Sequence, residues 1–244
     1  SQDEQDSRTY GKFAMIPILE PSNQQEAYDM TRYAFDLSEK IGTPVMIRVT
    51  TRLAHSRSGV ECSEKREQNE LHLPSNLRQF VLLPAIAKKQ YKSLLSKQSD
   101  MEQESMTRGF NQYFDGADKS KGIITCGLAY NYLKENFNNE PIPYPVLKIC
   151  QYPLPVEMIK KIYDECDELV VMEEGYPIVE DMIKGVLNNG KTIHGRTDGT
   201  LPRDGELNPN LIAIALGMRN EVGAPIPELV KARPPKLCDG CPHW

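Results

Sequence analysis

The segment 238–243 has the most specific spacing of metal-binding residue types in the chain. It reads Cys238-Asp-Gly-Cys241-Pro-His243. Two thiolates with two residues between them can bind one soft metal ion, and the intervening glycine lets the backbone fold around it. A complete zinc or iron–sulfur site needs about four ligands. We therefore interpret Cys238 and Cys241, with His243 as a third candidate, as half of a metal site. A tail with two free thiols is the alternative.

A basic loop follows a run of β-branched residues at 44–50, which predicts a strand. In open α/β sheets, ligands bind at the carboxyl ends of strands. Arg48, Arg52, His55 and Arg57 are therefore candidates for an anion site or for a contact with another subunit. Ion pairs that tie the loop to its own domain are the alternative.

Two acidic stretches are weaker candidates. Asp6 and Arg8 belong to a densely polar segment just before an apolar run at 13–19, which predicts a buried strand. They could line a cleft, but composition favours a solvated chain end. Glu173 and Glu174 follow another predicted strand, where adjacent carboxylates can bind a cation or shift each other's pKa. An exposed pair is the commoner outcome.

Other catalytic motifs are missing from the sequence. It has no glycine-rich phosphate loop of the Walker or dinucleotide type and no Gly-x-Ser-x-Gly turn. The four histidines, at positions 55, 72, 194 and 243, are too dispersed to predict a ligand set.

The first 60 residues predict a strand–helix–strand unit. The strand at 13–19 is followed by Ser22 and Gln25, whose spacing is typical of a capping box at a helix start. An apolar stripe through Met30 and Leu37 continues to Gly42, a predicted C-cap, and the strand at 44–50 follows. This order favours a parallel α/β sheet, and the unit is so short that we expect its earlier strands to precede Ser1.

The middle of the chain predicts a polar linker at 61–74 and an amphipathic segment from Ser75 to about residue 108, kinked or restarted at Pro84. The stretch 96–108 is nearly all polar, which indicates a solvated helix end or a loop.

A second α/β unit is predicted after residue 118. Its strands lie at 122–127, 146–150 and 168–173, with a possible fourth at 191–195. Helices are predicted at 128–137, from Pro155, from Ile178 and from Asn208–Pro209. Four prolines within 223–236 predict an extended linker.

Composition excludes several classes of protein. The chain has 244 residues and a net charge of −5, without the basic patch of a nucleic-acid-binding protein. No apolar run reaches the roughly 18 residues of a membrane span, and the polar start is not a secretory signal. Six cysteines without a signal predict reduced thiols rather than disulfides. Both ends look cut, and a processed mature chain is the alternative.

Taken together, three segments resemble one family. Residues 1–61, with PVMIRVTTRLAHSR as their most specific part, are similar to the end of the pyrimidine-binding domain in α subunits of indolepyruvate:ferredoxin oxidoreductase. GIITCGLAYNYLKE, LKICQYPLP and VVMEEGYPIVE resemble its transketolase-C-terminal-like domain. PPKLCDGCPH resembles the start of the diphosphate-binding domain, with Asp239 in place of the usual proline. The resemblance implies domain ranges 1–60, 61–118 (linker and long helices), 119–222 and 223–244.

The resemblance also implies a reaction, cofactors and partners. An aryl 2-oxoacid such as indolepyruvate is decarboxylated on thiamine diphosphate and oxidised to an acyl-CoA, with ferredoxin as electron acceptor. The parent enzyme is then a cytoplasmic homo- or hetero-oligomer that contains a β subunit, Mg²⁺ and [4Fe-4S] clusters. Asp6 and Arg8 match a family loop near the domain interface; with Arg52 and His55 they are the cofactor-binding candidates, and Cys238 and Cys241 the metal candidates. The activating glutamate and the Mg²⁺ ligands fall outside this chain, so we expect it to bind no cofactor and to be inactive alone.

Three alternatives remain. The chain could be a non-catalytic module for subunit assembly, or part of a related enzyme for another 2-oxoacid, since no residue here identifies an indole ring. A small Cys-x-x-Cys redox protein is disfavoured, because a redox pair follows a strand and opens a helix rather than trailing a proline-rich linker.

Overall fold

A computed structural model describes residues 5–68, 70–71, 73–137, 140–184, 214 and 227–231. Contact clustering divides the chain into Ser1–Asn188 and Asn189–Trp244, and the account below concerns the first of these units. The predicted strand at 191–195, the predicted helix start at Asn208–Pro209 and the three metal candidates Cys238, Cys241 and His243 lie outside the described residues.

The first sheet has three strands in the order β2-β1-β6. Strand β1 (Ile18–Leu19) runs parallel to β2 (Met46–Ile47) and antiparallel to β6 (Gln151–Tyr152), with Ile18 opposite Tyr152. Helix α2 (Gln24–Ile41) connects β1 to β2, which confirms the predicted strand–helix–strand order. The second half of the chain thus supplies one strand of the first sheet.

Helix α2 packs its predicted apolar stripe against this sheet. Met30, Leu37 and Ile41 are buried in a core shared with Leu19 and Met101. Gly42 ends the helix in the left-handed conformation with φ of 61°, where glycine avoids the steric cost of a Cβ, so the predicted C-cap is confirmed.

The predicted N-cap of α2 is wrong by one residue. Asn23 caps the helix by accepting a hydrogen bond from the Glu26 backbone N–H at 2.8 Å. Ser22 instead donates both its N–H and its hydroxyl to the Glu26 carboxylate. The arrangement differs from a capping box, because the Glu26 carboxylate accepts from Ser22 and not from the backbone N–H of the N-cap Asn23.

The apolar run at 13–19 does not form one strand, so this prediction is wrong in its first part. Helix α1 (Arg8–Ala14) ends at Met15, which has a φ of 57°, and β1 contains only Ile18 and Leu19. Gly11 lies so close to Ile18 that a Cβ there would stand 2.5 Å from the isoleucine side chain. The run divides because α1 folds back onto the strand that follows it.

The second sheet has four strands in the order β3-β5-β4-β7. Strand β4 (Lys121–Cys126) is parallel to β5 (Val146–Ile149) and to β7 (Glu168–Met172), while β3 (Gln112–Phe114) is antiparallel to β5. The three predicted strands are confirmed within one or two residues at their ends. The protein is an α/β protein with mixed sheets, the second of which is mostly parallel.

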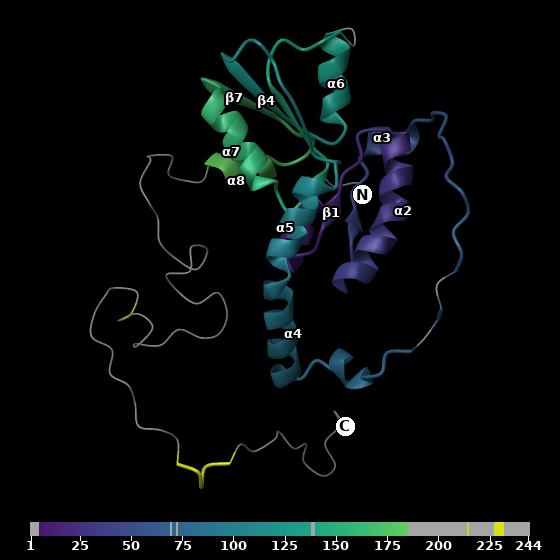
Figure 1. Ribbon diagram of the computed structural model, residues 1–244, viewed down its shortest axis with the longest axis vertical. Helices are drawn as coiled ribbons and strands as arrows, with labels where there is room; N and C mark the ends of the chain where they lie inside the picture. The colour runs from purple at the N-terminus through teal and green to yellow at the C-terminus, as the bar shows by residue number, and fades with distance from the viewer. Residues whose placement is uncertain are drawn as a thin grey trace. The chain divides into compact units, whose positions relative to one another are not determined.

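Helices cover both faces of the second sheet (Figure 1). Helix α6 (Ala129–Asn136) packs on one face through Leu133, in a core with Ile123 and Val146. Helices α7 (Val156–Glu165) and α8 (Ile178–Lys184) lie on the other face, where Ile162 and Val179 are fully buried. Within the described ranges, none of the helices is both long and apolar enough to cross a bilayer.

Three short helices and one longer one connect the two sheets: α3 (Thr51–His55), the 3₁₀ turn η1 (Leu77–Phe80), α4 (Pro84–Ser96) and α5 (Gln98–Thr107). Pro84 opens α4, as predicted for a restarted helix. The stretch 96–108 is not a solvated end or loop, because Met101 and Ser105 bury one side of α5. Helix α4 has no buried residue and extends away from both sheets (Figure 1).

Candidate functional site

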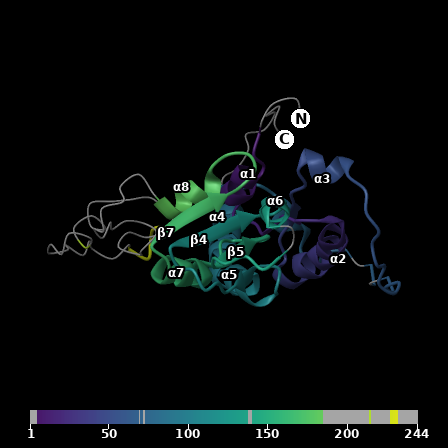
Figure 2. The same ribbon diagram turned by 90° about the horizontal axis from the view of Figure 1, so that it is seen from above.

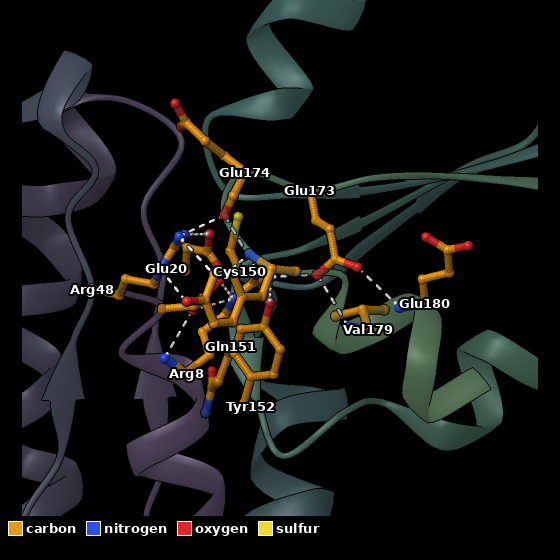
Figure 3. A network of polar contacts seen from close by, with 12 residues as sticks. Arg8, Glu20, Arg48, Cys150, Gln151, Tyr152, Glu173, Glu174, Val179 and Glu180 are labelled. Carbon is orange, nitrogen blue, oxygen red and sulfur yellow. Dashed lines mark hydrogen bonds and ion pairs between the residues drawn. The ribbon is translucent and has the colours of Figure 1, made fainter. Parts of the chain in front are cut away.

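A buried cluster of charged side chains lies where the two sheets meet (Figure 3). Its members follow the carboxyl ends of β1, β2 and β7 or come from the start of α1 and from β6. We call the following six residues the ionic cluster: Asp6, Arg8, Glu20, Arg48, Tyr152 and Glu173. Because strand ends converge here, residues from both halves of the chain contact one another directly.

Arg8 is the centre of the ionic cluster and is 1% exposed. Its guanidinium donates to the Asp6 carboxylate at 2.6 Å and to the Glu173 carboxylate at 2.8 Å. It also donates to the backbone carbonyls of Glu174 at 3.2 Å and Tyr176 at 3.0 Å. A planar fork of five N–H donors can satisfy this many acceptors at once, so α1 is tied to the loop after β7.

Arg48 forms the second half of the ionic cluster. It pairs with Glu20 and donates to the Glu174 carbonyl at 2.6 Å, and its Nε lies 3.4 Å from Asp6. The hydroxyl of Tyr152 donates to the other oxygen of Glu20 at 2.8 Å. The ends of β1, β2 and β6 are thereby joined to the same loop as α1.

Three carboxylates share two guanidiniums in this buried space. Burial by itself disfavours the Asp6 carboxylate, but the hydrogen bonds and charge of Arg8, with the charge of Arg48, hold the pKa of Asp6 below its ordinary value. For Glu20, burial outweighs both arginines and raises its pKa. Burial likewise raises the pKa of the neighbouring Cys126 thiol. Asp6 therefore stays ionised to lower pH than an ordinary aspartate, and Glu20 keeps its proton to higher pH than an ordinary glutamate.

Two glycines make room for these side chains. Gly127, after β4, has a φ of 50°, and a Cβ there would stand 2.6 Å from Glu20. Gly175, after β7, has a φ of 102°, and its Cβ would collide with the Asp6 carboxylate. Both positions combine a left-handed backbone with close approach, so a side chain at either would displace the ionic cluster.

The structure corrects two of the expectations for acidic residues. Asp6 and Arg8 are not part of a solvated chain end, because partners more than 160 residues away along the chain bury them. Glu173 is not exposed either: its side chain is 6% exposed and accepts hydrogen bonds from the Val179 and Glu180 backbone as well as from Arg8. A role for Asp6 and Arg8 in cofactor binding stays a prediction.

Sequence reasoning missed Glu20 and Tyr152. Each is a single residue beside an apolar run and a proline, and neither has a spacing that signals chemistry. The only signal was indirect, since Glu20 ends the apolar run at a strand's carboxyl end, where Arg48 was also expected.

An open hollow of about 580 Å³ lies beside the residues that follow β2. Its lining residues are Thr51, Arg52, His55, Ser56 and Glu174. We call it the α3 hollow. Arg52 and His55 are exposed, and the Arg52 guanidinium carbon lies 5.5 Å from the centre of the Tyr132 ring. One carboxylate oxygen of Glu174 is buried without a hydrogen-bond partner in the described structure. The hollow therefore offers the exposed side chains of Arg52 and His55 to a ligand. Arg57 is exposed and outside the hollow.

The described residues do not fit a bound Mg²⁺. They contain no group of three or more His, Cys, Asp or Glu side chains that could hold a metal ion. Two arginines already occupy the carboxylates of the ionic cluster, and the Arg52 guanidinium places a positive charge in the wall of the α3 hollow. We therefore assign no chemical step through a metal to these residues.

Comparison with known proteins gives a consistent set of relatives. No family model matches the chain. Indolepyruvate oxidoreductase subunit IorA is 34% identical over 256 residues in Methanothermobacter thermautotrophicus, 36% over 258 in Archaeoglobus fulgidus and 33% over 264 in Pyrococcus horikoshii. Each alignment covers 100% of this chain and 41% of the relative.

A solved structure also matches, but only weakly. The 2-oxoglutarate:ferredoxin oxidoreductase from Magnetococcus marinus, with 2-oxoglutarate, coenzyme A and succinyl-CoA bound, has 15% identity and a TM-score of 0.45. The match covers 74% of this chain and 40% of that one, and it is too weak to support any argument. The sequence alignments do not depend on this structural match. They cover the whole of this chain, which spans 41% of the length of each relative. The chain belongs to the family of indolepyruvate oxidoreductase IorA subunits.

Proposed function

We propose that this chain is part of an enzyme that oxidatively decarboxylates aryl 2-oxoacids, indolepyruvate among them, to acyl-CoA with ferredoxin as electron acceptor. The observation that carries the proposal is the alignment of the entire chain with IorA subunits at 33–36% identity. Since the chain spans 41% of those subunits, the reaction belongs to a larger assembly. The chain alone is then inactive.

The domain assignment is part of the proposal. Residues 1–60 form the end of a pyrimidine-type thiamine-diphosphate domain, residues 61–118 a linker with long helices, and residues 119–222 a transketolase-C-terminal-like domain. Residues 223–244 then form a linker and the start of a diphosphate-binding domain. The β1–α2–β2 unit supports the first range, and strands β4, β5 and β7 support the third, although β3 of the same sheet lies in the second range.

Thiamine diphosphate, Mg²⁺ and [4Fe-4S] clusters are the cofactors proposed for the whole enzyme. The first supplies the carbanion-stabilising chemistry of decarboxylation, and the clusters conduct electrons. The described residues contribute a scaffold: the ionic cluster fixes the ends of four strands, and the α3 hollow presents Arg52 and His55 at one of those ends. The proposed partners are the β subunit, ferredoxin, coenzyme A and the 2-oxoacid.

The proposal is tested by turnover of the complete enzyme that contains this chain. Purified anaerobically, it is given indolepyruvate, phenylpyruvate, pyruvate or 2-oxoglutarate with coenzyme A, and reduction of ferredoxin is followed by absorbance. We expect the two aryl acids to give the highest kcat/KM. Preference for pyruvate or 2-oxoglutarate would contradict the substrate assignment, and no reduction with any acid would contradict the reaction.

A second experiment tests the division of labour. Thiamine diphosphate and Mg²⁺ are titrated by calorimetry into the 244-residue chain and, separately, into the complete enzyme. We expect heat of binding only from the complete enzyme. Saturable binding to the chain alone would mean that the cofactor site lies within these residues.

A further inference from the structure

The α3 hollow has walls from separate parts of the chain. Arg52 and His55 belong to α3, which follows β2, and Glu174 lies in the loop after β7. Helices α3 and α6 lie next to one another in both views (Figure 1, Figure 2). Residues that follow strands of both sheets therefore face one open space of about 580 Å³, which is large enough for a small-molecule ligand.

The two main walls of the hollow are fixed by contacts with other elements. The Glu174 carbonyl accepts hydrogen bonds from Arg48 at 2.6 Å and from Arg8 at 3.2 Å, while its carboxylate points away from both arginines (Figure 3). The Ser56 hydroxyl, at the end of α3, accepts a hydrogen bond from the Gln24 side chain at 2.6 Å. Because the walls are already held in place, a ligand would bind without having to order them.

Arg52 is oriented by an aromatic ring. Its guanidinium carbon lies 5.5 Å from the centre of the Tyr132 ring. A guanidinium that packs on a ring face keeps its N–H edges available for a ligand. Burial and the charge of Glu174 raise the pKa of the Tyr132 phenol, and the charge of Arg52 acts against them. Both charges therefore lie near the same phenol.

The opposite charges in the hollow are not paired. Among the described residues, Arg52 and Glu174 form no ion pair, either with each other or with a third side chain. With His55 counted as neutral, the formal charges of the lining residues cancel. A ligand that carries both signs close together matches this pattern, whereas Glu174 would repel a doubly charged phosphate.

We propose that the α3 hollow binds a free α-amino acid, with its carboxylate on the Arg52 guanidinium and its ammonium group on the Glu174 carboxylate. The planar guanidinium matches a carboxylate through two parallel hydrogen bonds. An ammonium group has three N–H donors and forms charge-assisted hydrogen bonds with carboxylate oxygens. Tyr132 is a positioning residue, because its ring holds the guanidinium rather than the ligand. The open side of the hollow leaves room for the side chain of the amino acid.

Calorimetric titration of the 244-residue chain with four compounds that share a phenyl ring tests the proposal. L-Phenylalanine carries both charges, hydrocinnamate only the carboxylate and phenethylamine only the ammonium group. Phenylpyruvate has an oxo group in place of the ammonium group. We expect saturable binding of L-phenylalanine and at least about tenfold weaker binding of the other three, because each lacks one charge-assisted contact.

Substitutions locate the binding in the hollow. Arg52→Met and Glu174→Gln should each weaken the binding of L-phenylalanine by at least about tenfold. Arg57→Met and Glu157→Gln are the matched controls and should leave it unchanged, because both side chains are exposed and lie outside the hollow. Thermal unfolding of all four variants checks that each one is folded.

Tyr132 has a separate pair of variants. Tyr132→Leu should weaken the binding of L-phenylalanine roughly two- to fivefold, because it removes the ring that orients Arg52. Tyr132→Phe retains the ring and should bind as tightly as the parent. An equal loss in both variants would mean that the phenol itself contacts the ligand, and it would contradict the positioning role.

Three results would overturn the proposal. These are the absence of saturable binding of L-phenylalanine, binding of hydrocinnamate or phenylpyruvate that is as tight, and binding that survives both Arg52→Met and Glu174→Gln. Binding of inorganic phosphate or thiamine diphosphate in preference, lost with Arg52→Met, would assign the hollow to phosphate ligands and would overturn it as well. The titrations involve no turnover, so their outcome and that of the turnover experiment on the complete enzyme are independent.

Discussion

Arg48 and Arg52 lie four positions apart at the end of the same strand, yet they belong to two different environments. Arg48 is 9% exposed and is enclosed by Glu20, Asp6 and the loop after β7. Arg52 is exposed beside the Tyr132 ring in the α3 hollow. Both arginines follow β2 and therefore lie at the same edge of the sheet. Their roles differ because other side chains and a loop cover Arg48 but leave Arg52 exposed. The first has a structural role, and the second is available to a ligand.

Glu174 connects the two regions. Its backbone carbonyl accepts hydrogen bonds from Arg8 and Arg48 in the ionic cluster, while its side chain lines the α3 hollow. In Figure 3 the Glu174 carboxylate points away from Arg8 and Arg48. The ionic cluster therefore fixes one wall of the α3 hollow, and the following substitutions separate the two regions.

The largest expected difference is between Arg8→Met and Arg52→Met. Removal of Arg8 leaves the buried Glu173 without its counter-ion and leaves Asp6 with Arg48 alone, which costs about 3–5 kcal/mol in the free energy of unfolding. Removal of the exposed Arg52 should change it by less than about 0.5 kcal/mol. Urea unfolding of both variants measures the difference. Equal losses in the free energy of unfolding would mean that the ionic cluster contributes no more to stability than an exposed arginine.

Gly175→Ala should show the next largest effect. Gly109 is its matched control, because it also has a positive φ (95° against 102°) but nothing lies within 4 Å of its added Cβ. Gly109→Ala should lose about 1–2 kcal/mol from backbone strain alone. Gly175→Ala should lose roughly 1–2 kcal/mol more, because its Cβ also displaces Asp6. Equal losses in the two variants would show that the ionic cluster adapts freely.

The pH dependence of Glu20→Gln should give a smaller effect with a definite sign. The pKa of Glu20 is raised in the folded state, so its favourable contribution is complete below its unfolded value of 4.5 and is lost as pH rises through the folded pKa. Glutamine stays neutral throughout. The variant should therefore gain stability relative to the parent as pH rises from that value toward neutrality.

Unfolding free energies of the two proteins, measured across this pH range, check the sign. A constant difference between them would mean that the Glu20 carboxyl titrates normally. Asp6 acts in the opposite sense: its pKa is lowered, so its contribution is present at neutral pH and is lost as pH falls through the folded value.

The smallest effect on stability is expected for His55→Ala in the α3 hollow. The exposed imidazole can be removed for less than about 0.5 kcal/mol. If the α3 hollow contacts the cofactor, however, the same change made in the complete enzyme should raise the KM for thiamine diphosphate. Thr107→Ala on α5 is the control for both readouts. An unchanged KM would remove His55 from the cofactor-binding candidates.

Local signals in the sequence were sufficient for much of the fold. The β-branched runs predicted β4, β5 and β7, and the stripe through Met30 and Leu37 predicted α2. Helix α1 was missed because seven residues with a polar start show no apolar periodicity. Strand β6 was missed because a two-residue strand before Pro153 carries no alternation.

The site was less predictable than the fold, for a physical reason. Asp6 and Arg8 are polar residues in a polar segment, and composition alone indicates solvent for them. Their burial depends on Glu173, Gly175 and Tyr176, which follow β7 of the second sheet and lie more than 160 positions further along the chain. Arg52 and His55, by contrast, were chosen as candidates from their position after a strand, and both line the α3 hollow.

Residues 146–152 have a consequence for how the molecule can be taken apart. This short run supplies β5 to one sheet and, after a single intervening residue, β6 to the other. A protease that cuts the exposed stretch 61–68 would leave an amino-terminal piece whose β1 still pairs with β6 of the carboxyl-terminal piece. The nicked protein should therefore elute as one particle under native conditions and yield two fragments only after denaturation.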